Sequence, residues 1–235
     1  MRKKPFIGIV LLSMEEVRQV FQPGMQVPEH YDFMVGVHAV VRGDAFPRVA
    51  AHRAVYMGDP SDIGSKEMTG NLKALPTCNT LFFDGWPDLG MLDVLKSQKG
   101  SIGKDVGVIV NLPDSEIEWA EWSPEPVART LAQYRGTIDY LCFNGGGRPD
   151  ADYNPEFTRT WVSHLQKNGS CGICVAGKFC EASVERLRPL LRQFPETSVI
   201  AGRHLRDADG TLNVDRARRY LAYAGELYDQ YLAAA

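Results

Sequence analysis

The stretch from Ile138 to Leu205 alternates between two kinds of segment, and this alternation constrains the fold more than any other feature of the sequence. Apolar runs of strand length, such as CGICVAG at 171–177, are separated by amphipathic runs of helix length, such as EFTRTWVSHLQK at 156–167. Each apolar run ends in glycine and a polar residue. This pattern is typical of βα units that form a parallel sheet with functional residues at the ends of its strands.

The rest of the chain repeats this unit. Eight segments are predicted to be strands, and they are residues 5–12, 32–40, 52–57, 79–84, 106–112, 138–144, 171–177 and 197–203. Apolar residues three and four positions apart predict helices between and after them. The predicted helices are residues 14–21, 65–75, 88–99, 181–194 and 215–232, with two more beginning at Pro124 and Pro155.

Eight strands and their helices in 235 residues predict an α/β protein with a single (βα)8 TIM barrel domain over residues 1–235. The weakest part of the pattern is GDAFPRVA, which offers at most a short helix between the second and third strands. The alternative is an open doubly wound sheet. That fold normally carries a glycine-rich nucleotide loop after its first strand, where this chain has LLSMEEV.

Composition narrows the classes of partner. The net charge is −3 and the isoelectric point is about 6.0, so we expect neither a nucleic-acid nor a membrane partner. The start MRKKPFIGIVLLS resembles a signal peptide, but no small-residue cleavage site precedes MEEVRQV, which favours a first buried strand. Five cysteines lie mostly in or beside apolar strands, which is typical of free thiols in the cytoplasm. A homo-oligomer is left open.

Strand alternation predicts which side chains face the inside of the barrel. In the strand at 138–144, Leu141 and Phe143 face the helices, so Asn144 faces inward at the end. The same reasoning on four more strands places one inward polar residue near each carboxyl end. The five residues are His38, Asp84, Asn111, Asn144 and Lys178, and the eighth strand adds Arg203 or His204. Each has an ordinary structural explanation alone, but their convergence predicts a site at the mouth of the barrel.

Two glycine-containing strand ends are predicted to bind an anion. Gly177 precedes Lys178 at the end of the seventh strand, and we expect a helix to open within a few residues. Gly202 and Arg203 offer the same features after the eighth strand. In barrels, the loops after strands seven and eight are the usual phosphate site.

Over about 60 residues this part of the chain resembles the phosphate-binding (βα)8-barrel superfamily, which includes phosphoribosylanthranilate isomerase and ribulose-phosphate epimerase. Gly177-Lys178 stands where the family carries a glycine pair. The first strand ends in Leu12-Ser13, where phosphoribosylanthranilate isomerases carry a cysteine. The resemblance implies a barrel enzyme acting on a sugar phosphate.

The segment NGGGRPDADYNP after the sixth strand is either a plain turn or a lid over a bound ligand. We assign Gly145, Gly146 and Arg148 to substrate binding on the second interpretation. A zinc site at the C-x2-C pair is disfavoured, because Cys171 and Cys174 would point to opposite faces of one strand. We therefore predict neither a metal nor another cofactor.

These observations predict an enzyme that acts on a small phosphorylated metabolite by proton transfer at carbon, as an isomerase, epimerase or lyase. Asp84 is the expected general base and His38 a general acid. Asn111 and Asn144 would orient the substrate, and Lys178 would neutralise negative charge. Two alternatives remain: a Schiff-base lyase that uses Lys178, and a barrel that binds a ligand without turnover.

Overall fold

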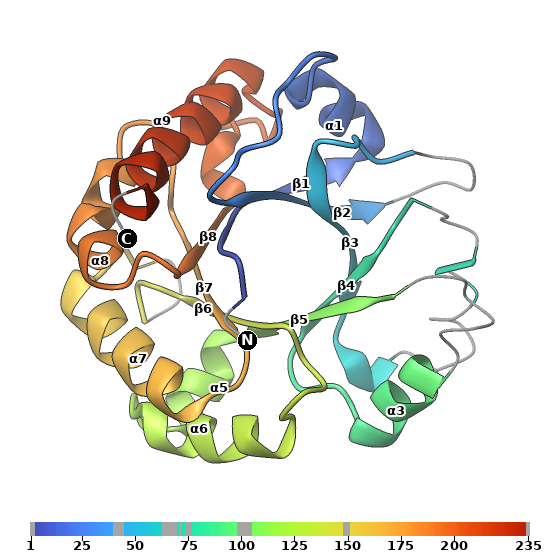
Figure 1. Ribbon diagram of the computed structural model, residues 1–235, viewed down its shortest axis with the longest axis vertical. Helices are drawn as coiled ribbons and strands as arrows, with labels where there is room; N and C mark the ends of the chain where they lie inside the picture. The colour runs from blue at the N-terminus through green and yellow to red at the C-terminus, as the bar shows by residue number, and fades with distance from the viewer. Residues whose placement is uncertain are drawn as a thin grey trace.

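The computed structural model describes residues 3–39, 45–62, 70, 72–73, 77–97, 105–147 and 151–233. Eight strands, each parallel to its neighbours, close into a barrel in chain order (Figure 1). They are β1 (Phe6–Ser13), β2 (Asp32–Ala39), β3 (Ala50–Gly58), β4 (Thr80–Asp84), β5 (Gly107–Leu112), β6 (Tyr140–Asn144), β7 (Gly172–Gly177) and β8 (Ser198–Ala201). The predicted (βα)8 barrel is confirmed, and the open-sheet alternative is wrong.

Helices surround the barrel (Figure 1). The α-helices are α1 (Met14–Val20), α3 (Leu89–Ser97), α5 (Asp114–Trp119), α6 (Pro124–Gln133), α7 (Pro155–Asn168), α8 (Arg188–Gln193) and α9 (Val214–Leu232). The 3-10 helices are η1 (Pro60–Asp62), η2 (Val184–Leu187) and η3 (Arg203–Leu205). The helix expected at 65–75 lies largely outside the described residues. No helix among the described residues is long and apolar enough to cross a membrane.

Local sequence sets several helix starts. Ser13 caps α1, since its Oγ accepts a hydrogen bond of 3.4 Å from the Glu16 N–H. Pro124 and Pro155 occupy the first turns of α6 and α7, as predicted. One prediction was wrong: residues 181–194 form no continuous helix. Pro189 cannot donate a backbone hydrogen bond inside a helix, so η2 precedes a separate α8 there.

The apolar side chains form two layers, as strand alternation predicts. Leu141 and Phe143 are buried between the barrel and the helices, where the fully buried Trp161 of α7 lies 5.4 Å from Phe143, ring centre to ring centre. Cys142 and Cys174 are buried inside the barrel and pair in register across β6 and β7. Among the described residues, side chains therefore fill the interior of the barrel below the mouth.

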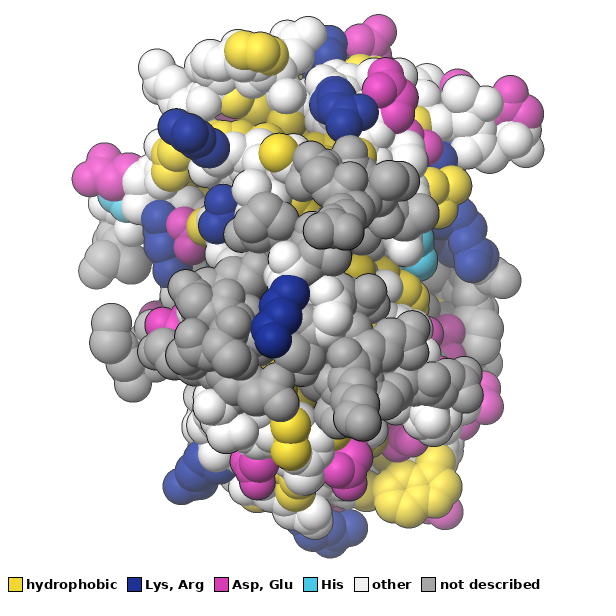
Figure 2. All heavy atoms as spheres, turned by 90° about the vertical axis from the view of Figure 1, so that its right-hand side faces the viewer, with side chains coloured by type: hydrophobic (Ala, Val, Ile, Leu, Met, Phe, Trp, Pro, Cys, Tyr) yellow, Lys and Arg dark blue, Asp and Glu magenta, His cyan; other side chains and the backbone are white. Residues whose placement is uncertain are grey.

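Charged side chains of both signs are scattered over the face drawn in Figure 2, and the described residues there form no continuous basic patch. This distribution agrees with the small net charge of −3.

Candidate functional site

A cavity of about 490 Å³ lies at the carboxyl ends of the strands. This is the end of a (βα)8 barrel where enzymes place their active sites. Eight of the residues predicted from the sequence line it: Asp84, Asn111, Asn144, Gly177, Lys178, Gly202, Arg203 and His204. The alternation argument therefore placed side chains from five different strands or strand ends around one cavity.

Asp84 is held in the cavity by two neighbours. Asn111 lies opposite it in register on β5 and donates a hydrogen bond of 2.7 Å from Nδ2 to Asp84 Oδ1. The hydroxyl of Tyr56, at the end of β3, is hydrogen-bonded to the same carboxylate. Burial, together with this hydrogen bond and the charge of Asp84, raises the pKa of Tyr56 well above its usual range. The phenol therefore stays protonated and donates to Asp84.

Tyr56 is a site residue that the sequence analysis missed. Its ring stacks on Phe82 with centres 5.3 Å apart, and it lines the cavity beside Asp84. The signal was present, because the buried Val55 faces the helices and so leaves Tyr56 facing inward.

His38 lies at the rim and not in the lining of the cavity. Its imidazole is only partly covered by protein and packs on Tyr56, with ring centres 4.2 Å apart. Burial and the charge of Arg206 lower the pKa of His38, although Asp84 acts in the opposite direction. The lowered pKa favours the neutral imidazole, and the role of His38 as a general acid stays a prediction. A neutral imidazole can still donate one N–H to a developing oxyanion.

Lys178 and Arg203 bring two cations to the cavity. The Lys178 side chain is 29% exposed, and its Nζ lies 3.7 Å from Asp152 Oδ1 on the segment before α7. Arg203 is the first residue of η3. A phosphate group could be held between such side chains by charge-assisted hydrogen bonds.

The helix expected to open within a few residues of Gly177, at 181, begins later, at Val184. The segment after β7 folds back through Ser183, whose Oγ accepts from the Cys180 N–H at 3.0 Å and donates to the Lys178 carbonyl at 2.9 Å. The first helical residue is Val184, in the four-residue 3-10 helix η2. An anion after β7 would therefore be bound by the Lys178 side chain rather than by the N-terminus of an α-helix.

The segment after β6 positions Asn144 rather than lining the cavity with its glycines. Asn144 Nδ2 donates to Asp114 Oδ1 at 3.3 Å, and its Oδ1 accepts from the Gly146 N–H at 3.0 Å. Gly145 is buried, and a Cβ there would lie 2.7 Å from a Val175 methyl carbon. Neither Gly145 nor Gly146 lines the cavity, and their contact with substrate stays a prediction.

Arg148 lies outside the described residues. Asp114 lines the cavity as a second carboxylate and was not predicted from the sequence. It is the first residue of α5, immediately after Pro113, so its position depends on how the chain leaves β5. An acidic residue so close to a strand end was the available signal.

No family model and no curated protein matches this sequence. Solved structures resemble it. Phosphoribosyl anthranilate isomerase from Thermus thermophilus is 16% identical, with a TM-score of 0.56 over 97% of this chain and 100% of that one. The enzyme of that name from Thermotoga maritima is 11% identical, with a TM-score of 0.60 over 94% and 99%.

These likenesses show the fold alone: the chain is a (βα)8 barrel. The resemblance expected from about 60 residues extends, at the level of the fold, over nearly the whole chain.

Proposed function

We propose that this protein is an isomerase that acts on a small phosphorylated metabolite by proton transfer at carbon in the mouth cavity. One observation carries the proposal: the Asp84 carboxylate, held by Asn111 and Tyr56, lines the same cavity as Lys178 and Arg203. The carboxylate supplies a base, and the cations supply an anion-binding site.

The roles follow from the geometry. Asp84 takes a proton from a carbon next to a carbonyl or imine, and the bonding electrons move onto the oxygen or nitrogen. The proton is then returned to the former carbonyl or imine carbon, and the hydroxyl proton on the adjacent carbon moves to the negatively charged oxygen or nitrogen. The two transfers together complete the isomerisation without any other reactant. The Tyr56 phenol and the His38 imidazole lie close enough to Asp84 to stabilise the developing charge. Lys178 and Arg203 hold the phosphate at the opposite wall.

The names of the two similar structures suggest the first substrate to test, which is phosphoribosyl anthranilate. The end of β1 carries Leu12-Ser13 in place of the cysteine expected in that family, so ribose phosphate and ribulose phosphate belong in the same panel. Incubation in deuterated water, followed by mass spectrometry, should show incorporation of one deuterium at carbon. Binding of every phosphate compound without any exchange would contradict the proposal and favour the barrel that binds without turnover.

Replacing Lys178 by alanine should weaken the binding of a sugar phosphate by about 1–3 kcal/mol, the loss expected for one charge-assisted hydrogen bond. Isothermal titration calorimetry measures the change. The control is Lys167→Ala, which removes an exposed lysine from the last turn of α7 and should leave affinity unchanged. Equal affinities in the Lys178 variant and the wild type would place the phosphate elsewhere.

A further inference from the structure

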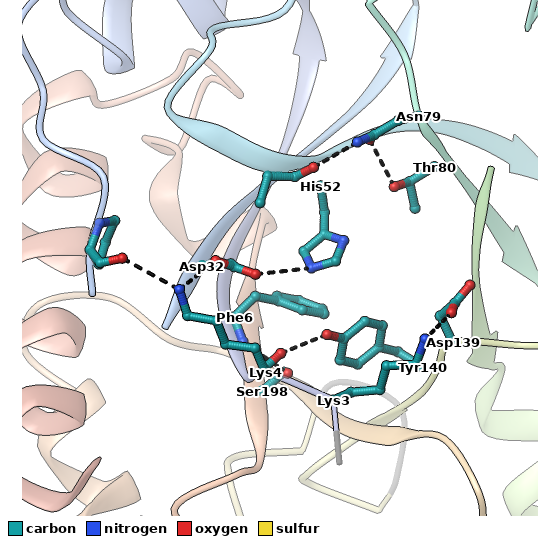
Figure 3. Close-up of polar contacts among 12 residues, drawn as sticks. Lys3, Lys4, Phe6, Asp32, His52, Asn79, Thr80, Asp139, Tyr140 and Ser198 are labelled. Atoms are coloured by element: carbon teal, nitrogen blue, oxygen red, sulfur yellow. Dashed lines mark hydrogen bonds and ion pairs between the residues drawn. The ribbon is translucent and has the colours of Figure 1, made fainter. Parts of the chain in front are cut away.

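A second cavity lies at the amino ends of the strands, at the other end of the barrel from the mouth. Its volume is about 560 Å³, against about 490 Å³ at the mouth. Its wall is built from the starts of β3, β4, β5 and β6 and from α3, and Figure 3 shows much of its polar lining. Nothing in the proposed reaction uses this cavity.

Some of its polar groups have a structural purpose. Asn79 Oδ1 accepts the Arg53 N–H at 2.8 Å, and Asn79 Nδ2 donates to the Ala51 carbonyl at 2.8 Å. Asp139 Oδ2 accepts the Val108 N–H at 2.9 Å. These side chains satisfy backbone groups where strands begin, so they need no ligand to explain them.

His52 has no such explanation. Its ring lies 5.3 Å from Phe6 and 5.3 Å from Tyr140, centre to centre, on the floor of the cavity. The buried Nε2 makes no hydrogen bond within the described part of the chain, and it lies 3.7 Å from Asp32 Oδ2. In Figure 3 the other ring nitrogen points away from Asp32. Burial lowers the pKa of His52, although Asp32 and Asp139 oppose it. The neutral ring keeps an acceptor for a ligand.

The charged lining is of both signs. Lys3 forms an ion pair with Asp139, and Lys96 donates to the Gly136 carbonyl. An ammonium group has three N–H donors, so each lysine can also bind a carboxylate. Asp105 lies on the same lining and can attract an ammonium group. Between these charges the wall is apolar, formed by Leu95, Val106, Ile109 and the ring of Tyr140.

We infer that this cavity binds a free α-amino acid with an apolar side chain. Lys3 and Lys96 would hold the carboxylate, and Asp105 and the His52 ring nitrogen would accept from the ammonium group. The side chain would lie along the apolar wall. The volume is within the range of about 300–1,000 Å³ that small-molecule sites occupy. This cavity is separate from the one at the mouth, so the inferred binding of an amino acid does not depend on the reaction proposed there.

The test is isothermal titration of the full-length protein with L-leucine and L-phenylalanine. The expected result is saturable binding of at least one of them. Isoamylamine lacks the carboxylate of leucine and isocaproate lacks its ammonium group, so both should bind at least about tenfold more weakly. Equal affinity for either analogue would overturn the assignment of an amino acid, as would the absence of binding by both amino acids.

Two variants locate the site. Lys96→Met should weaken binding about tenfold or more, as expected for the loss of one charged partner. Gly107→Leu should abolish it, because a Cβ at Gly107 meets no atom closer than 3.4 Å and the longer side chain would occupy the cavity. Circular dichroism and thermal melting would check that both variants fold.

Lys178→Ala at the mouth is the matched control and should bind the amino acid as the wild type does. Loss of binding in that control, with binding retained by Gly107→Leu, would move the ligand to the mouth.

Discussion

Replacing Asp84 by asparagine is expected to lower kcat by about 10²–10⁴ and to leave the affinity for substrate nearly unchanged. The amide keeps the shape of the side chain, and its oxygen can still accept the hydrogen bond from Asn111 Nδ2, now 2.7 Å long. It cannot take a proton from carbon. Rapid-quench turnover and deuterium exchange into the substrate measure the chemical step, and calorimetry measures binding.

Asp114→Asn is the matched control for this prediction. Asp114 is a second carboxylate in the same cavity, and its Oδ1 accepts from Asn144 at 3.3 Å. Its role is to orient Asn144, so the variant should retain exchange and lose little of kcat. Full exchange by the Asp84 variant together with a large loss in the Asp114 variant would transfer the role of base to Asp114.

The fold and most of the mouth could be predicted because a parallel barrel imposes one rule on every strand. Residues two apart share a face, so the apolar pair Leu81 and Phe83 in β4 sets Asp84 inward without any knowledge of its neighbours. The same rule in β7 places Lys178 at the end of the strand. The carboxyl ends of all parallel strands meet at one end of a barrel, which turns these separate assignments into one site.

The remaining features depend on contacts between residues far apart in the chain, which alternation does not encode. The return of the segment after β7 through Ser183 is set by its hydrogen bonds to the Lys178 carbonyl and the Cys180 N–H. The pairing of Asn144 with Asp114 joins residues 30 positions apart. The cavity at His52 is likewise built by four strand starts, none of which carries a recognisable motif.

A nearly buried ion pair between Glu16 in α1 and Arg206 after η3 connects the first βα unit with the last. Arg206 donates to both carboxylate oxygens of Glu16, at 2.7 and 2.6 Å, and the two side chains are only 11% and 16% exposed. Glu16 also accepts the Leu12 N–H at 2.8 Å, at the end of β1. Burial raises the pKa of Glu16, but the hydrogen bonds from Arg206 and Leu12 and the charge of Arg206 outweigh it, so the pKa is lowered.

This direction sets the pH dependence of stability. A carboxyl group whose pKa is lower in the folded state stabilises the protein above its unfolded pKa, and that stabilisation is lost as the pH falls through the folded value. We expect the free energy of unfolding to decline in acid partly through Glu16. Urea titrations of the wild type and of Glu16→Gln as a function of pH should show a smaller decline in the variant. Identical slopes would mean that Glu16 does not contribute.

Arg206→Met should lower the free energy of unfolding by about 3–5 kcal/mol, because it leaves the Glu16 carboxylate nearly buried without its partner. Adding Glu16→Gln should restore part of that loss, since the uncompensated charge is then gone. Urea unfolding of the two single variants and the double variant gives the coupling between the residues. The matched control is Arg159→Met, which removes an exposed pair with Glu156 on α7 and should cost less than about 1 kcal/mol. Strictly additive losses at Glu16 and Arg206 would show that the pair does not hold the two ends of the barrel together.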